Sequence, residues 1–284
     1  MAIFNFIILC VLCASVFKLG MKIAVFGLGE AGSLIAADLA ARGVQMTGFD
    51  PADVKTPELV TRVDHPAAAV ADADVVIALT AGADAMTALQ QALAQIPTTA
   101  LYADFSTNTA TAKMRMATIA ATHGMSFVDI ALMGTVPGKG LRTSALAAGN
   151  GATRFVTAFA ELGMPVTRVS DQAGDAATRK LLRSVMMKGL AGTVIEAMRG
   201  AERAGCADWL WANLADEITR ADARLLSRLV RGTGQHAVRR LHEMEAVAAL
   251  LSDLGVEPIM TRATVENLRR IPDEGLPQIP VLPD

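Results

Sequence analysis

Residues 22–50 read KIAVFGLGEAGSLIAADLAARGVQMTGFD, and this stretch decides the fold. It opens with an apolar, partly β-branched run, which is typical of a buried strand. The motif Gly-x-Gly-x-x-Gly follows at residues 27–32, and behind it apolar residues recur at helical spacing until Gly43. Residues 44–49 predict a second strand, which ends at Asp50. Strand, glycine loop, helix, strand and acid in this order predict a βαβ unit that binds a dinucleotide, whereas a glycine-rich turn in another α/β unit is the alternative.

Each glycine of the loop is expected at its position for a different physical reason. Gly27 allows the tight turn out of the strand, Gly29 lets a pyrophosphate approach the backbone, and Gly32 lets the helix pack close to the sheet. The unpaired N–H groups and the positive dipole end at the start of the helix favour a phosphate. We therefore expect the pyrophosphate to bind at Gly27, Leu28, Gly29, Glu30, Ala31 and Gly32.

Asp50 follows the loop at about the distance that the ribose-binding acid of this motif requires. There a carboxylate can accept hydrogen bonds from both ribose hydroxyls, whereas the 2′-phosphate of NADP would meet a negative charge. The sequence therefore favours NAD as the cofactor, without excluding NADP.

Length and composition limit the number of domains and the classes of partner that the chain can have. The chain has 284 residues, enough for two domains, and 52% of them are hydrophobic. A formal net charge of −2 does not indicate the basic surface that nucleic-acid binding requires. Two of the three cysteines, Cys10 and Cys13, lie in the first 20 residues, so no disulfide framework is implied.

Residues 1–20 form an apolar leader, MAIFNFIILCVLCASVFKLG. The apolar run is short for a membrane span and lacks the positive start of a secretory signal. Met21 directly precedes the first strand, so one hypothesis is that translation starts there; the other is a genuine signal or anchor. Because the coenzyme pool is cytoplasmic, we expect a cytoplasmic protein with no membrane partner unless the leader is real.

Strand and helix patterns alternate up to residue 170, and this predicts an α/β Rossmann domain, with a doubly wound and mainly parallel sheet, over residues 21–170. Further strands are expected at 59–63, 74–80, 101–105, 126–132, 145–148 and 166–169, and helices at 66–73, 82–96, 111–123 and 153–162. Ligands bind beyond the carboxyl ends of such strands. Thr80, Ser106, Thr107 and the segment after Leu132 are therefore expected on the ligand side.

From Gly174 onward only helical periodicity remains, which predicts an all-α domain over residues 171–284. Helices are expected at 174–204, 207–230, 234–254 and 261–270, with breaks at Gly205, Gly232–Gly234 and Gly255. Trp209 and Trp211 are expected either in the core of this domain or at a dimer interface.

Several segments resemble the β-hydroxyacid dehydrogenases and the related 6-phosphogluconate dehydrogenases. DFSTNTA at 104–110 is similar to their D-x-S-T segment near the nicotinamide, and residues 129–134 stand where they carry D-A-P-V-S-G. Gly174-x5-Lys180 is similar to their G-x-G-x-x-x-K, whose lysine carries out the proton chemistry. The resemblance covers about residues 21–200. It implies an NAD(P)-dependent oxidoreductase acting on the CH–OH group of a small hydroxy acid, or reducing the matching carbonyl compound, with proton transfer by Lys180 and a homodimeric assembly.

The second half resembles a subgroup of this family, through HAVRRLHEME at 236–245 and PIMT at 258–261. Members of that subgroup carry a phosphogluconate-dehydrogenase-like C-terminal domain of largely unassigned function. The resemblance therefore indicates a class of enzyme and does not name a substrate.

The substrate end departs from the family pattern. Met133 replaces a serine that helps to hold the substrate carboxylate, and Arg183 and Ser184 replace two asparagines, so substrate recognition must differ. Retention of Lys180 speaks against the imine reductase relatives, in which that position changes. The basic, polar residues at helical spacing from Lys180 suit a small anionic substrate, although a solvated helix face is the alternative. The candidate substrate-binding residues are Met133, Gly134, Thr135, Arg183, Ser184, Lys188 and His236.

His236 and His242 match no common zinc spacing, and we expect no metal site. We interpret these histidines as part of an ion-paired helix surface or a subunit contact. The alternative is that His236 reaches the substrate. Two other functions stay open: an oxidative decarboxylase of a β-hydroxy acid, and a non-catalytic NAD-binding sensor or scaffold.

Overall fold

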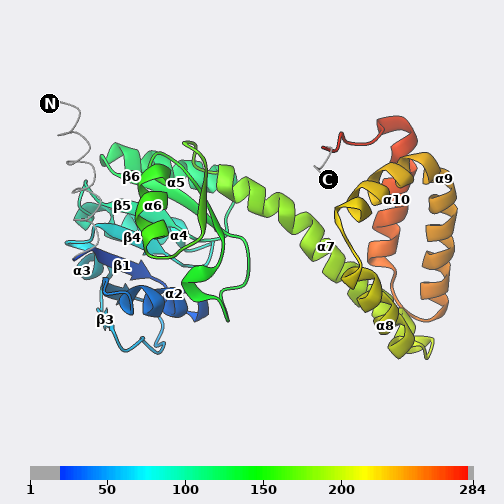
Figure 1. Ribbon diagram of the computed structural model, residues 1–284, viewed down its shortest axis with the longest axis horizontal. Helices are drawn as coiled ribbons and strands as arrows, with labels where there is room; N and C mark the ends of the chain where they lie inside the picture. The colour runs from blue at the N-terminus through cyan, green and yellow to red at the C-terminus, as the bar shows by residue number, and fades with distance from the viewer. Residues whose placement is uncertain (1–19, 281–284) are drawn as a thin grey trace. The chain divides into compact units, whose positions relative to one another are not determined.

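The computed structural model describes residues 20–280 and divides the chain into two compact units (Figure 1). The division falls between Arg183 and Ser184, inside helix α7 (Asp175–Arg203). Nearly all of the leader, with Cys10 and Cys13, lies outside the described residues. No helix within residues 20–280 is both long and apolar enough to cross a membrane.

The first unit is built on one eight-stranded sheet, with the strand order β3-β2-β1-β4-β5-β6-β7-β8. The strands are β1 (Lys22–Phe26), β2 (Gln45–Phe49), β3 (Val60–Arg62), β4 (Val75–Ala78), β5 (Leu101–Asp104), β6 (Ser126–Leu132), β7 (Ala145–Ala148) and β8 (Val166–Ser170). Neighbouring strands are parallel everywhere except between β6 and β7. The predicted α/β Rossmann fold with a mainly parallel sheet is therefore confirmed.

Helices cover both faces of this sheet, which explains why its strands are apolar without alternation. Ile23 and Val25 of β1 belong to one core, while Ala24 and Phe26 belong to the core on the opposite face. The first core includes α2 (Glu30–Ala40) and α6 (Ala152–Glu161), and the second includes α3 (Pro66–Val70), α4 (Ala85–Ala92) and α5 (Ala110–Thr122).

The second unit is helical, as predicted, with the remainder of α7 and helices α8 (Ala207–Thr219), α9 (Ala223–Asp253) and α10 (Ile259–Glu274). The break predicted at Gly232–Gly234 falls slightly early: both glycines are helical, and α9 is interrupted by a kink at His236, which has a φ of −130° and a ψ of 25°. A further break was not predicted: α8 ends at Thr219, and the Asp222 side chain caps α9. Gly234 has a packing role, because a Cβ there would lie 2.4 Å from Leu276 Cδ1.

A buried glutamate joins α7 to α10 in this unit. The Glu196 carboxylate accepts hydrogen bonds from the Met260 N–H (2.7 Å), the Thr261 N–H (2.9 Å) and the Thr261 hydroxyl (2.7 Å). Burial alone would raise the pKa of Glu196, but these hydrogen bonds lower it below the ordinary value of 4.5. A charged Glu196 therefore serves as the N-terminal cap of α10, whose cap residue Pro258 makes no side-chain hydrogen bond of its own.

Candidate active site

The three glycines of the loop have different surroundings. A Cβ on Gly27 would lie 2.4 Å from the Leu79 carbonyl oxygen, and a Cβ on Gly32 would lie 1.9 Å from that of Gly27. Gly27 also has a φ of +90°, which favours glycine. A Cβ on Gly29, in contrast, would have no atom within 4 Å, and Gly29 caps α2 without a side-chain hydrogen bond. The loop thus packs tightly at its first and third glycines and stays open to a ligand at the second.

Asp50 lies directly beyond β2, beside this loop. Its carboxylate accepts hydrogen bonds from the Leu28 N–H (2.7 Å) and the Ala52 N–H (2.9 Å). Each carboxylate oxygen can accept more than one hydrogen bond, so Asp50 can still receive ribose hydroxyls. The structure therefore fixes the acid at the glycine loop, where the dinucleotide motif requires it.

Arg62 at the end of β3 fixes the segment that follows Asp50. Its guanidinium donates to the carbonyl oxygens of Asp50 (3.0 Å), Ala52 (2.6 Å) and Val54 (2.8 Å). Sequence reasoning missed Arg62, because its role depends on the pairing of β3 with β2. An arginine at the end of a short strand gives no such signal on its own.

A cavity of about 610 Å³ lies at the carboxyl ends of β1, β2 and β4. Four predicted cofactor residues line it together: Gly27, Gly29, Asp50 and Thr80. Asp84 and Thr87 also line it, from a run that the sequence offered either as a cofactor-side loop or as an ordinary helix start, whereas Asp64 and His65 were missed. The volume is in the range of ordinary ligand pockets. The open glycine, the start of α2 and the ribose-side acid fit an NAD-type dinucleotide.

The loop after β5 packs against the loop after β4. The Asn108 amide donates to the Gly82 carbonyl oxygen (2.7 Å), and a Cβ on Gly82 would lie 2.4 Å from the Thr107 carbonyl oxygen. The predicted cofactor residues Ser106 and Thr107 differ within this loop. Ser106 is buried and uses its N–H (3.1 Å) and its hydroxyl (3.0 Å) to bind Asp104, so its side chain has a structural role.

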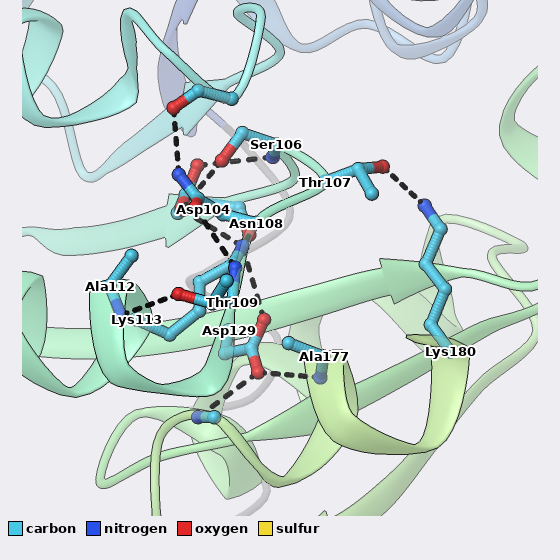
Figure 2. Close-up of polar contacts among 12 residues, drawn as sticks. Asp104, Ser106, Thr107, Asn108, Thr109, Ala112, Lys113, Asp129, Ala177 and Lys180 are labelled. Carbon is cyan, nitrogen blue, oxygen red and sulfur yellow. Dashed lines mark hydrogen bonds and ion pairs between the residues drawn. The ribbon is translucent and has the colours of Figure 1, made fainter. Parts of the chain in front are cut away.

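Thr107 is the point of contact with Lys180, the residue predicted to transfer the proton. The Lys180 ammonium donates to the Thr107 hydroxyl at 2.9 Å, and Figure 2 shows the lysine of α7 reaching across to the loop after β5. The structure therefore brings together two residues that were predicted separately and that lie 73 positions apart.

A second lysine, Lys113, lies deeper in the same region and was missed. It is fully buried between the carboxylates of Asp104 (2.9 Å) and Asp129 (3.1 Å) (Figure 2). In the sequence Lys113 is one of several polar residues on an ordinary helical pattern, so nothing distinguished it from a surface lysine. Only the presence of two acids on adjacent strands could have given a signal.

The remaining predicted substrate residues are more scattered. Met133 is half-buried and packs against a small cluster of Ala131, Ala148 and Ala176, whereas Gly134 and Thr135 are exposed. Arg183 is exposed on α7; Ser184 and Lys188 lie further along α7, in the second unit. His236 is exposed on α9 of the second unit, at the one residue of that helix with non-helical φ and ψ. Within residues 20–280, no group of three or more His, Cys, Asp or Glu side chains could hold a metal ion.

Fold and site together define a class: proteins that bind NAD(P) on an α/β domain and continue into a helical domain. Comparison with known proteins gives the family. Residues 22–168, more than half of the chain, match the NAD binding domain of 6-phosphogluconate dehydrogenase, and residues 201–271 match a domain of unknown function, DUF1932. The chain belongs to the 6-phosphogluconate dehydrogenase-like family, as the resemblance predicted, and its first unit is the NAD(P)-binding domain of that family.

Solved structures with this fold cover nearly the whole chain. A conserved hypothetical protein from Sinorhizobium meliloti is 30% identical over 90% of this chain and 91% of its own, with a TM-score of 0.58. The reductive aminase from Aspergillus terreus, in complex with NADPH and ethyl-5-oxohexanoate, is 19% identical over 90% of this chain and 95% of its own, with a TM-score of 0.75.

One curated protein is also similar: the uncharacterized 28.5 kDa protein in the 7S RNA 5′ region of Methanothermus fervidus. It is 26% identical over 145 residues, which are 51% of this chain. The match spans about half of that relative, 56% of its length.

Proposed function

We propose that the protein oxidises the CH–OH group of a small anionic hydroxy acid, or reduces the matching carbonyl compound, with NAD preferred over NADP. The observation that carries the proposal is the 2.9 Å hydrogen bond between Lys180 Nζ and Thr107 Oγ1. This hydrogen bond holds the Lys180 side chain at the carboxyl ends of the strands, the edge of the sheet at which the cofactor cavity opens.

The cofactor, when bound, would supply the hydride chemistry through its nicotinamide, and residues of the chain would handle the proton. The Lys180 amine takes the proton from the alcohol oxygen, or returns it to the carbonyl oxygen in the reverse direction. The Thr107 hydroxyl, as hydrogen-bond acceptor, orients the Lys180 side chain toward the loop after β5. Arg183, one helical turn beyond Lys180, supplies a positive charge for a carboxylate or phosphate of the substrate.

Preference for NAD follows from Asp50. Because its carboxylate is held at the loop by the Leu28 and Ala52 N–H groups, it cannot swing away from a 2′-phosphate without losing both hydrogen bonds. A phosphate there would meet this negative charge, whereas a 2′-hydroxyl would donate to it.

We further propose that the protein forms a homodimer through α7 and α8. Large apolar side chains on these helices are exposed in the chain by itself: Leu182, Val185, Met186, Leu190, Ile195, Trp209, Trp211 and Ile218. The exposed tryptophans rule out the core alternative for Trp209 and Trp211 and fit the interface alternative. A second copy of the chain is the partner that we propose for this apolar surface.

A coenzyme-reduction assay over a panel of small hydroxy acids tests the proposal, with NAD and NADP side by side and with the reverse reaction on the matching carbonyl compounds and imines. Lys180→Met should abolish most turnover while the coenzyme still binds. Lys22→Met is the matched control, because Lys22 is a partly exposed lysine of the same unit that pairs with Asp72 at the amino end of β1. Turnover that survives Lys180→Met would exclude the assigned role.

The same assay separates the two competing functions. Release of carbon dioxide with product would identify an oxidative decarboxylase, because simple dehydrogenation conserves the carbon skeleton. Tight coenzyme binding without turnover on the whole panel would favour a sensor or scaffold.

A further inference from the structure

Two buried carboxylates lie side by side beneath the loop after β5. Asp104 on β5 and Asp129 on β6 are partners in the register of two parallel strands, and neither is exposed. Adjacent strands are about 4.8 Å apart, so two charged side chains in register on a dry sheet repel each other strongly. Such an arrangement requires a positive group between the two acids.

Lys113 of α5 supplies that group. Its ammonium donates a hydrogen bond to the Asp104 carbonyl oxygen (2.9 Å) and forms ion pairs with Asp104 Oδ2 (2.9 Å) and Asp129 Oδ1 (3.1 Å). Lys113 therefore links the end of β5 to β6 by charge.

The outer ends of the two carboxylates bind other elements. Asp104 holds the N–H and hydroxyl of Ser106, next to Thr107. Asp129 Oδ2 accepts from the N–H groups of Gly174 (3.1 Å) and Ala177 (2.9 Å), at the start of α7. Lys113 thus connects the loop after β5 with the start of the helix that carries Lys180.

These contacts close a ring. From Thr107 it passes through the neighbouring Ser106 to Asp104, Lys113 and Asp129, then through the first turn of α7 to Lys180, and back to Thr107 (Figure 2). The backbone is also tight here, because Gly174 has a φ of +99° and a Cβ on it would lie 2.9 Å from the Ala110 carbonyl oxygen. The start of α7 therefore has little freedom to shift while Asp129 holds it.

We propose that Lys113 is a positioning residue for the proton-transfer reaction. By holding Asp104 and Asp129 together it fixes the first turn of α7 against the loop after β5, and so places Lys180 at Thr107. This inference rests on the proposed function, because it assigns the reaction to Lys180. Lys113 itself is buried and acts only through the two carboxylates.

Kinetics of Lys113→Met in the full chain give the first test. The substitution keeps an unbranched, flexible side chain that lacks the terminal ammonium, and so removes the charge. We expect turnover to fall by about 10²-fold, the usual effect of a displacement of about 1 Å at a reacting group, while the dissociation constant of the coenzyme stays unchanged. In a Lys180→Met background the same substitution should have no further effect, because the residue through which it acts is gone. Effects that multiply independently would overturn the proposal.

Hydrogen exchange gives a second test that needs no turnover. Lys113→Met should speed amide exchange at residues 174–180, and Lys22→Met should not. Equal protection of this segment in wild-type protein and Lys113→Met would overturn the proposal even if activity fell. If Lys180→Met were as active as wild type, the proposed function would fail, and hydrogen exchange would still decide whether Lys113 holds the start of α7.

Asp129→Asn is a second variant on which the same measurements can be made if Lys113→Met does not fold. It preserves the shape of the side chain and an oxygen that can accept from Gly174 and Ala177, but weakens the pair with Lys113. We expect a smaller loss of turnover, about tenfold, with the same loosening at residues 174–180. Unchanged turnover and exchange in Asp129→Asn would overturn the proposal.

Discussion

The two units of the chain bury their apolar side chains to very different extents. Phe26, Phe155 and Phe159 of the first unit are at most 1% exposed, whereas Trp209 and Trp211 of the second are 67% and 61% exposed. Among the described residues of the second unit, the buried hydrophobic side chains are limited to Ala201, Ala237, Leu251, Val256, Val265 and Leu268. The first unit therefore carries a full core of its own, while the second presents apolar surface of the kind that association buries.

This difference separates the tasks of the two units. The cofactor loop, the buried acids with Lys113, and Lys180 with Thr107 all lie in the first unit. A rigid core suits such a site, because catalytic groups act well only when the surrounding packing fixes them. We expect substitutions in the first unit to change chemistry or unfolding, and substitutions on the apolar surface of the second to change assembly.

The largest effect is expected at Lys180. Lys180→Met should lower kcat by about 10²- to 10⁴-fold, the range for loss of a general acid or base, with coenzyme affinity retained. Steady-state kinetics and coenzyme fluorescence titration measure the two quantities. A comparable loss in the control Lys22→Met would place the chemistry elsewhere and contradict the division of tasks.

Phe155→Ala tests the core of the first unit. The ring is fully buried, stacks on Phe159 with 4.0 Å between centroids, and meets Phe105 edge to face at 5.9 Å. Its removal should lower the free energy of unfolding by about 3–5 kcal/mol, measured by denaturant titration. Leu59→Ala, at a side chain that is 65% exposed in the same unit, should cost much less.

Local patterns allowed most of the first unit to be predicted. The bounds of β6 and β7 match the sequence prediction, because each is a short apolar run between clear turn signals. The glycine loop could also be predicted, because the spacing of its glycines indicates which backbone positions pack tightly and which stay open to a ligand. These features depend on residues that are close together in the sequence, so one sequence is enough to predict them.

Features that depend on partners far along the chain could not be predicted. Lys113 meets Asp104 and Asp129 only after β5, β6 and α5 have packed, and Arg62 meets the segment after Asp50 only through the pairing of β2 with β3. The break predicted at Gly232–Gly234 was misplaced, because the interruption of α9 lies at His236. The glycines do not fix its position, since a helix interior tolerates glycine at a cost of about 1 kcal/mol.

Val185→Lys tests whether the exposed surface of the second unit is an interface. Val185 lies on α7 and is 72% exposed in the isolated chain. If two copies associate there, a charge at that position should weaken the dimer by about 2 kcal/mol or more and shift the protein to monomer at micromolar concentration. Light scattering after gel filtration measures the mass. Leu59→Lys, an equal change on the first unit, should leave the mass as it is in wild type.

Asp50→Asn tests whether the first unit selects the cofactor through the charge of Asp50. The amide keeps the shape but loses the negative charge, so repulsion of a 2′-phosphate falls. The ratio of kcat/KM for NAD over that for NADP should drop about tenfold, a change of about 1.4 kcal/mol. A ratio that does not move would show that Asp50 does not select the cofactor.

Glu196→Gln gives the smallest effect and the one most dependent on pH. The folded-state pKa of Glu196 lies below the ordinary value of 4.5, so its charged form stabilises the fold above that value. At neutral pH the glutamine variant should lose about 1 kcal/mol, since a charged cap of α10 becomes a neutral one. As the pH falls below 4.5 and through the folded-state pKa, wild type loses the same contribution, so the two stabilities should converge. Urea titrations of both proteins across this range measure the difference, and a gap that stays constant with pH would show that the Glu196 charge does not stabilise the helix.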